Sequence, residues 1–174
     1  MRAIQKTPNR FGEKDGSFLV ESIVALSLAV VGILGIVVLL TRSLGLTSNV
    51  SQRAVATYLA AEGIEVTKNI IDAAIAKGDG WVAAFSGIPS VFEVEYDSDS
   101  ASLVELSGIA WPLRFDSANG TYSYQPRGQE TPFRRVMTVA ADDASSTVNA
   151  VVTWTVRGTK ETLNLEDHFW NWRQ

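Results

Sequence analysis

Residues 22–40 form a run of nineteen residues without a charged side chain, and no other feature constrains the fold of this chain as strongly. A helix of this length spans about 28 Å, close to the ~30 Å hydrocarbon core of a bilayer. Inside a bilayer the backbone polar groups must be satisfied within the segment, which a helix achieves. The run therefore predicts one membrane-spanning helix near the N-terminus.

The residues that precede this run are predominantly basic. Residues 1–16 contain four basic and two acidic side chains: Arg2, Lys6, Arg10 and Lys14, with Glu13 and Asp15. Basic segments stay on the cytoplasmic side of a membrane, and most of the chain lies beyond the span. We therefore expect a cytoplasmic N-terminus and a large C-terminal domain outside the inner, or cytoplasmic, membrane.

The junction between the leader and the span has an unusual composition. Residues 16–21 read Gly-Ser-Phe-Leu-Val-Glu, so that Glu21 is the only charge between Gly16 and Leu40. A secretory signal peptide is cut beyond its apolar segment and loses it. A glycine on the charged side of the apolar segment indicates instead a cut that leaves the membrane segment in the mature protein.

This pattern resembles the N-terminal signal of the type IV prepilin and pseudopilin superfamily. The resemblance is close over residues 16–40 and covers the rest of the chain only in layout. It implies that a prepilin peptidase cleaves after Gly16 and N-methylates the new terminus, Ser17. The family usually has Phe or Met where this chain has Ser17, so the resemblance supports cleavage more strongly than methylation.

Glu21 has two interpretations. A carboxylate in a bilayer costs about 2.5–3.5 kcal/mol at mid-depth and less near the surface, so Glu21 can sit at the interface and reach water. Alternatively, it pairs with a cation, and cleavage would create one in the α-amino group of Ser17. The family resemblance implies that Glu21 of one subunit pairs with the Ser17 amine of a neighbour in a filament.

Residues 41–76 continue the helical pattern without a proline. Their apolar positions form two stripes that lie nearly opposite each other, which predicts two partners, a sheet of the same chain and another helix. Glycines at 78 and 80 predict the end of the helix. One stripe holds Val55, Leu59, Val66, Ile70 and Ala73, and the other holds Ile64, Ile71 and Ile75.

The pattern changes to strands and turns after the helix. Because the order is one long helix followed by strands without βαβ alternation, we predict an α+β fold. A long N-terminal helix, membrane-spanning in its first half, would pack on a C-terminal antiparallel sheet, the layout of type IV pilins.

The predicted segments are a leader at 1–16, a membrane or filament-core helix at 17–40, an amphipathic helix at 41–76 and a β-rich exported domain at 77–174. Alternating patterns and turn residues predict strands at 91–96, 103–106, 111–115, 121–125, 133–140, 148–157 and 161–167, with hairpin loops at 116–120, 142–146 and 158–160.

The residues of this chain do not favour catalysis. There is no cysteine and only one histidine, His168, so thiolate sites and cysteine–histidine pairs are excluded. We therefore expect a non-enzymatic protein without catalytic residues or a cofactor.

Two short segments contain metal-ligand residue types. Residues 166–168 read Glu-Asp-His, but neighbouring residues of a strand point to opposite faces, which disfavours convergence on a metal. Residues 97–99 read Asp-Ser-Asp, but the glycine and the distal glutamate of a calcium loop are missing. We expect no metal at either place.

The charge balance disfavours nucleic acid. The full chain has 15 basic and 19 acidic residues, and removal of residues 1–16 leaves a formal net charge of about −6. The one downstream basic cluster, Arg127, Arg134 and Arg135, lies among aromatic residues and could contact DNA. We favour a simpler interpretation, in which Arg134 or Arg135 pairs with an acidic neighbour.

The C-terminal residues Phe169, Trp170 and Trp172 are aromatic and close together. Because each ring would bury a large apolar area, we expect them to pack against the helix or the sheet. A contact with a neighbouring subunit or an external ligand is the alternative.

The sequence thus favours a structural filament subunit similar to the minor type IV pilins. It would be a substrate of the prepilin peptidase, would reside in membrane lipid before assembly, and would then join other pilin or pseudopilin subunits through an inner-membrane assembly platform in a cell-surface or periplasmic filament. A pseudopilin of a type II secretion system is the nearest alternative. A third hypothesis is an uncleaved, single-pass, membrane-anchored binding module, for which Gly16 and Glu21 would be dispensable.

Overall fold

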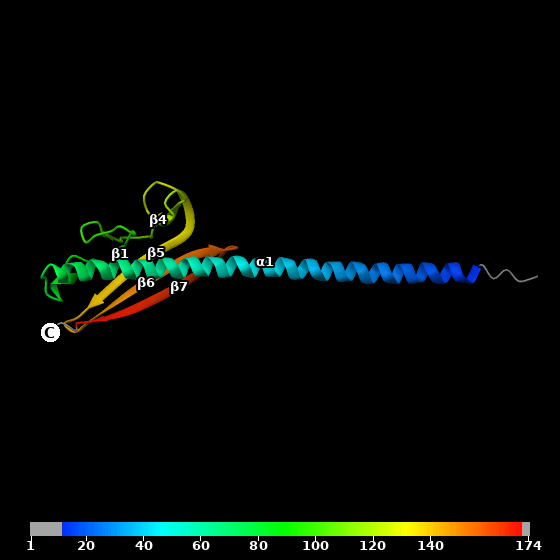
Figure 1. Cartoon of the computed structure of the whole chain (residues 1–174), viewed down its shortest axis with the longest axis horizontal. Helices are drawn as coiled ribbons and strands as arrows, with labels where there is room; N and C mark the ends of the chain where they lie inside the picture. The colour runs from blue at the N-terminus through cyan, green and yellow to red at the C-terminus, as the bar shows by residue number, and fades with distance from the viewer. Residues whose placement is uncertain (1–11, 172–174) are drawn as a thin grey trace, which may run out of the picture. The chain divides into compact units, whose positions relative to one another are not determined.

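The structure of this chain is a computed structural model that describes residues 12–171, with side chains from Gly16 onward. Helix α1 (Gly12–Ala76) is followed by the short 3₁₀ helix η1 (Ala83–Phe85) and by seven strands (Figure 1). The chain separates into two units, Met1–Ser48 and Asn49–Gln174. The second unit contains the last part of α1 and all of the strands, and it has the α+β layout that the sequence predicts.

All seven predicted strands are present. Most differ from the predicted ranges by a few residues at their ends, and the largest difference is the earlier start of β5. The strands are β1 (Val91–Glu93), β2 (Val104–Glu105), β3 (Pro112–Asp116), β4 (Thr121–Ser123), β5 (Gln129–Ala141), β6 (Ser145–Val156) and β7 (Thr159–Trp170).

The strands form one antiparallel sheet in which β5 is the central strand. Along one side of β5, β1 and β3 pair with successive parts of it, and β2 and β4 extend these two pairs. Along the other side β5 pairs with β6, and β6 pairs with β7. Strands β2 and β7 therefore lie at opposite edges of the sheet.

Tight turns join the long strands, as predicted. The backbone N–H of Gly120 donates to the carbonyl of Asp116 (2.8 Å) in the loop between β3 and β4. The β6–β7 hairpin turns at Arg157 and Gly158, which have φ values of 49° and 83°. Two positive φ values in a two-residue loop are those of a type I′ turn, whose twist matches that of the flanking strands.

Helix α1 ends at the predicted glycine. Gly78 adopts a φ of 103°, its N–H donates to the carbonyl of Ile75, and the N–H of Asp79 donates to the carbonyl of Ala74. This is a Schellman motif, in which a left-handed glycine lets the chain cap the last helical carbonyls. The chain then reverses towards the sheet.

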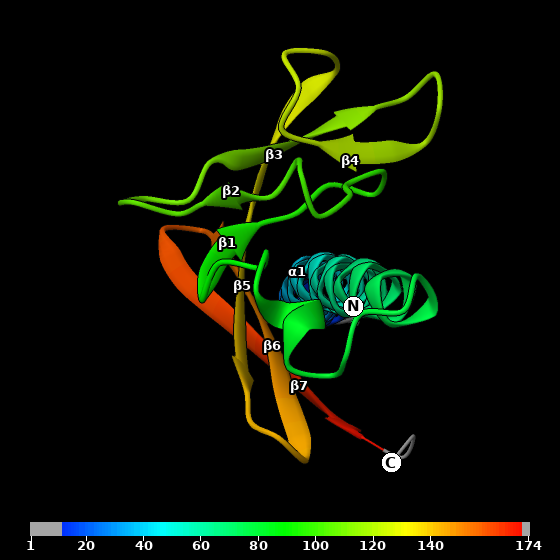
Figure 2. The ribbon, with the colours of Figure 1, turned by 90° about the vertical axis from the view of Figure 1, so that its left-hand side faces the viewer.

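The two apolar stripes that the sequence predicts on the helix pack into one core with the sheet, so the prediction of a separate partner for each stripe is wrong within this unit. In residues 49–76 the buried positions form one broad face, centred on the small residues Ala56, Ala60, Gly63 and Thr67. The two predicted stripes are the flanks of this face, because the strands curve around one side of the helix (Figure 2). Ala73, which the sequence analysis placed in a stripe, is exposed. The opposite face of the helix carries mainly polar and small residues and offers no second apolar stripe.

Close contact between this part of α1 and the sheet centres on Gly63. A Cβ atom at this position would lie 2.7 Å from Sδ of Met137 and 3.0 Å from Cδ of Arg135. Only glycine leaves room for these two β5 side chains beneath the helix. Helix and strands share one hydrophobic core, to which Leu59, Phe92 and Leu113 contribute.

Candidate functional site

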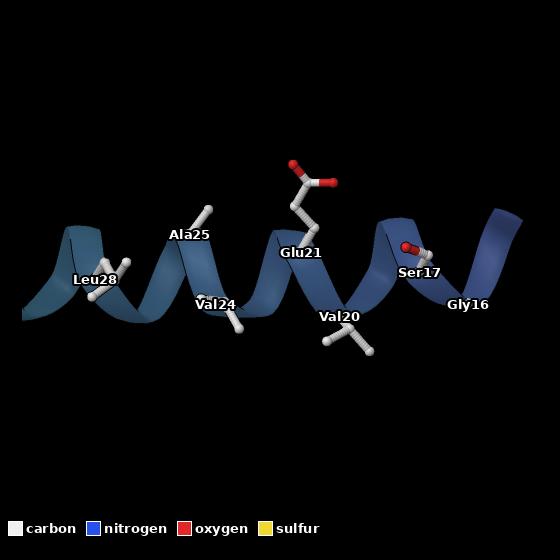
Figure 3. Close-up of a pocket in the computed structure, with 7 residues that line it drawn as sticks. All are labelled: Gly16, Ser17, Val20, Glu21, Val24, Ala25 and Leu28. Carbon is white, nitrogen blue, oxygen red and sulfur yellow. The ribbon is translucent and has the colours of Figure 1, made fainter.

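The predicted cleavage site lies in the N-terminal part of α1. Gly16 and Ser17 are helical, in the second turn after the start of α1 at Gly12. Figure 3 shows this segment, with Glu21 one turn beyond Ser17. The basic leader residues Arg2, Lys6 and Arg10, on which the predicted orientation depends, lie outside the described residues.

Glu21 and its neighbours give the helix two unlike sides. In Figure 3 the carboxylate of Glu21 projects to the same side as the methyl group of Ala25, whereas Val20 and Val24 point away from it. Helical periodicity places Gly32 on the side of Glu21 and Ala25 as well. A carboxylate, a methyl group and a glycine thus follow one another along one side of the helix.

The apolar part of this helix has the properties of a membrane span. It is the candidate membrane-spanning helix among the described residues, and no part of its most apolar stretch is buried by the protein. Its hydroxyl groups are satisfied internally, since Ser22 donates to the carbonyl of Phe18 (2.8 Å) and Ser27 to that of Ile23 (2.7 Å). Such i to i−4 bonds remove the cost of an unpaired hydroxyl in lipid. We conclude that residues 12–171 contain one segment suited to anchor the chain in a membrane, and that it lies near the N-terminus.

The predicted basic cluster is dispersed by the fold. Arg135 is fully buried and forms an ion pair with Glu62 (3.0 Å), which confirms the prediction that Arg134 or Arg135 pairs with an acidic neighbour. Arg134 instead donates to the carbonyl of Ala110. Only Arg127 remains exposed, so the three arginines do not form a common surface for a nucleic acid backbone.

Arg135 connects three elements of the second unit. Its Nη1 donates to the carbonyl of Leu59 (2.7 Å) and to Oε1 of Glu62, and its Nη2 donates to the carbonyl of Val94 (2.5 Å). The guanidinium group therefore links β5 to the helix and to the segment that follows β1. Its role in the sheet domain is structural.

The two segments with metal-ligand residue types form local hydrogen bonds. Glu166 and His168 share one face of β7, where Oε1 and Nε2 lie 3.0 Å apart, and Asp167 lies between them in the strand. The carboxylate of Asp99 accepts hydrogen bonds from the N–H groups of Ala101 and Ser102, and hydrogen bonding with Ser102 lowers the pKa of this carboxyl group. Among residues 12–171 no cluster of three or more such side chains could hold a metal ion.

The C-terminal aromatic residues divide between core and surface. Phe169 packs against the hydrophobic core, as predicted, whereas Trp170 is 67% exposed. Trp172 lies outside the described residues. The prediction of packing is therefore confirmed for Phe169 and wrong for Trp170, because consecutive residues of β7 point to opposite faces of the sheet.

The sequence analysis missed an acidic cavity at the other edge of the sheet. Glu93, Glu95 and Asp97 line it together with Trp111 and Tyr124. Glu93 and Glu95 are spaced two apart in the predicted strand 91–96, and Asp97 follows two residues later, directly beyond its end. Such a spacing places strand side chains on one face. This alternation of acidic residues was the sequence pattern from which an acidic surface could have been predicted.

A comparison of this chain with family models, with curated proteins and with solved structures gave no match. The functional interpretation therefore depends on the residues of the chain and on their arrangement in the structure.

Proposed function

We propose that this chain is a non-enzymatic filament subunit similar to the minor type IV pilins. A prepilin peptidase would cleave it after Gly16, and its N-terminal helix would then carry it from the membrane into a filament. One observation carries the proposal: Gly16 and Glu21 stand immediately before an uncharged helical span whose side chains all face outward. A secretory signal or a simple anchor requires neither residue at that place.

Cleavage would require a local change in the helix. The bond between Gly16 and Ser17 lies within a helical turn, and proteolysis needs the backbone in an accessible, opened form. Glycine weakens a helix by about 1 kcal/mol relative to alanine, which favours opening at this bond. A bulky residue at position 16 would oppose both the opening and the close approach of a peptidase.

Assembly would use the side of the helix that carries Glu21. Removal of residues 1–16 would leave an α-amino group on Ser17, and a neighbouring subunit could place that amine beside the Glu21 carboxylate. Ala25 and Gly32 on the same side of the helix would allow the neighbouring backbone to approach closely. Pairing would remove the cost of a carboxylate in lipid, so it would favour the packed filament over the isolated subunit.

This proposal includes a location and a set of partners. The subunit would start as a single-pass protein of the inner membrane, with its N-terminus in the cytoplasm and its sheet domain outside. It would contact the peptidase, an assembly platform in that membrane and other pilin or pseudopilin subunits. N-methylation of Ser17 would accompany cleavage.

The first experiment measures the intact mass and the N-terminal peptide of the protein from its native membrane. For the unchanged chain we expect an N-terminus at Ser17, with or without one methyl group. The variant Gly16→Leu should accumulate with residues 1–16 attached. Gly32→Leu is the matched control, because nothing lies within 4 Å of the added Cβ at either glycine, and it should be cleaved normally. An unchanged chain that retains residues 1–16 in peptidase-competent cells would contradict the proposal and favour the anchored module.

A further inference from the structure

The acidic cavity that the sequence analysis missed lies at the β1–β2 edge of the sheet. It has a volume of about 580 Å³ and is lined by residues of β1, of the loop that follows it and of β2, by Trp111 directly before β3, and by the two residues that follow β4. This size is within the range of cavities that accept a side chain or a small ligand. Its walls combine the carboxylates of Glu93, Glu95 and Asp97 with the ring of Trp111.

Two of these carboxylates are held in place by backbone hydrogen bonds. Oε1 of Glu93 accepts from the N–H of Trp111 (2.7 Å), and Oε1 of Glu95 accepts from the N–H of Tyr124 (2.9 Å). Burial raises the pKa of the Glu93 carboxyl group. Asp97, in contrast, is exposed at the rim. The cavity is therefore a preformed acidic pocket that a cation would complement.

Two large apolar side chains of this pocket are exposed. Trp111 and Val104, which line it, are 68% and 61% exposed, although both lie in the sheet domain and outside the membrane span. Exposed apolar residues gathered around a pocket with polar walls mark an interaction site. The acidic walls repel anionic lipid headgroups and nucleic acid phosphates, so the occupant that fits is a basic protein segment.

The opposite edge of the sheet presents such a segment. At the tip of the β6–β7 hairpin Arg157 and Lys160 are exposed, with Glu161 as the one acidic neighbour. Arg157 holds a φ of 49°, the only positive φ of a non-glycine residue among those described. A left-handed conformation costs a residue with a Cβ about 1–2 kcal/mol, and asparagine or glycine is usual at this turn position. A strained arginine at an exposed tip is consistent with a functional side chain.

We propose that Arg157 of one copy of this chain inserts into the acidic pocket of a second copy. The Glu95 and Asp97 carboxylates would pair with its guanidinium group, and the Trp111 ring would provide a cation–π contact. The inference rests on the proposed function, because it describes how subunits contact each other outside the membrane. Pocket and hairpin lie at opposite edges of the sheet, so the contact joins two different surfaces and adds copies in an open series.

The absence of cysteine makes disulfide cross-linking a clean test. The full-length double variant Asp97→Cys/Arg157→Cys, oxidised in the native membrane, should give a ladder of multimers on a non-reducing gel, and reduction should collapse the ladder. Each single variant should lack the ladder. The matched control is Asp97→Cys/Asp143→Cys, whose second cysteine occupies the exposed β5–β6 hairpin loop at the other end of β6, and it should stay monomeric.

A charge exchange tests the same contact without cysteine. Asp97→Arg places a like charge opposite Arg157 and should reduce the yield of chemically cross-linked multimers about tenfold, which corresponds to about 1.4 kcal/mol. Combining it with Arg157→Asp should restore the yield. Both residues are exposed, so neither change disturbs the core.

Two results would overturn the inference. One is no ladder from the Asp97–Arg157 pair, and the other is an equal ladder from the Asp97–Asp143 control. The N-terminal mass of the same samples separates this failure from a failure of the proposed function. A terminus at Ser17 without a ladder rejects only the pocket contact, whereas a retained leader rejects the filament subunit and the contact that rests on it.

Discussion

Arg135 is the residue on which the sheet domain depends most. It is one of the largest fully buried side chains, and its hydrogen bonds reach the helix, Glu62 and the segment after β1. A buried guanidinium group is costly unless its donors are paired. Here both terminal nitrogens are paired, with the carbonyls of Leu59 and Val94 and with the Glu62 carboxylate, whereas the buried Nε has no hydrogen-bond partner. The sequence predicted a paired arginine at 134 or 135, but the partner is 73 residues away.

Removing this side chain should destabilise the sheet domain strongly. For Arg135→Ala we expect a loss of about 3 kcal/mol or more in the free energy of unfolding, because the change leaves a cavity and unpaired carbonyls. The matched control is Arg114→Ala, whose pair with Glu130 is longer (3.5 Å) and less buried, with the two side chains 31% and 60% exposed, so it should cost less, about 1 kcal/mol. Urea unfolding monitored by tryptophan fluorescence provides both values. Equal losses in the two variants would contradict this account of Arg135.

At the scale of elements, the small residues of α1 determine how the helix meets the sheet. Ala56, Ala60 and Gly63 lie on the line of closest approach, and larger apolar residues fill the spaces on either side. A helix with leucine on that line would stand further from β5 and would leave voids along its flanks. The packing distance is thus set by the residues with the least volume.

A larger residue at position 63 should show that the close packing of the helix on the sheet requires glycine there. Gly63→Val should destabilise the domain by about 1–3 kcal/mol, because its Cβ would meet Met137 and Arg135. Adding Met137→Ala should recover part of the loss by removing the closest contact, and the double-mutant cycle would measure the coupling. Gly80→Val is the control, since no atom lies within 4 Å of a Cβ there. If the losses in unfolding free energy from Gly63→Val and Met137→Ala simply add in the double variant, the contact with Met137 is not the cause of the destabilisation by valine at position 63.

Strand β5 shows why sequence reasoning recovered its position but not its length. The predicted strand starts at Phe133, directly after Pro132, and a proline within a sheet is usually confined to an edge, a strand start or a bulge. The observed strand begins at Gln129, because the pairing of β3 with β5 shifts register around Pro132 and the ladder continues on both sides. Whether a proline ends a strand depends on the partner strand, and local sequence does not contain that information.

On the scale of the whole molecule, membrane anchoring and core formation belong to different parts of the chain. Every residue of the hydrophobic core lies at or after Ala56, whereas the apolar side chains of residues 17–40 are exposed. The second unit begins at Asn49, within α1. One continuous helix therefore contributes an apolar segment for lipid and an amphipathic segment for the sheet.

We expect the fragment of residues 49–174 to fold without the membrane segment. It keeps the whole core, the Arg135 hydrogen bonds and all seven strands, so nothing that holds the sheet domain together is removed. It should stay soluble without detergent and should unfold in one cooperative transition, with coincident circular dichroism and fluorescence curves. Separate transitions, or aggregation without detergent, would show that residues 12–48 contribute to the stability of the fold.

Properties that depend on near neighbours in the chain could be predicted from the amino-acid sequence. These are the membrane-suited helix, its end at Gly78, the number of strands, their hairpin turns and the Gly16–Glu21 signal on which the proposed function depends. Each is set by length, periodicity or the conformational range of a single residue. The contacts between residues far apart in the chain became known from the fold alone: Arg135 with Glu62, both helix stripes with one sheet, and three acidic residues with Trp111 around one pocket. Such contacts depend on strand order and sheet curvature, and neither can be predicted from a short segment of the sequence.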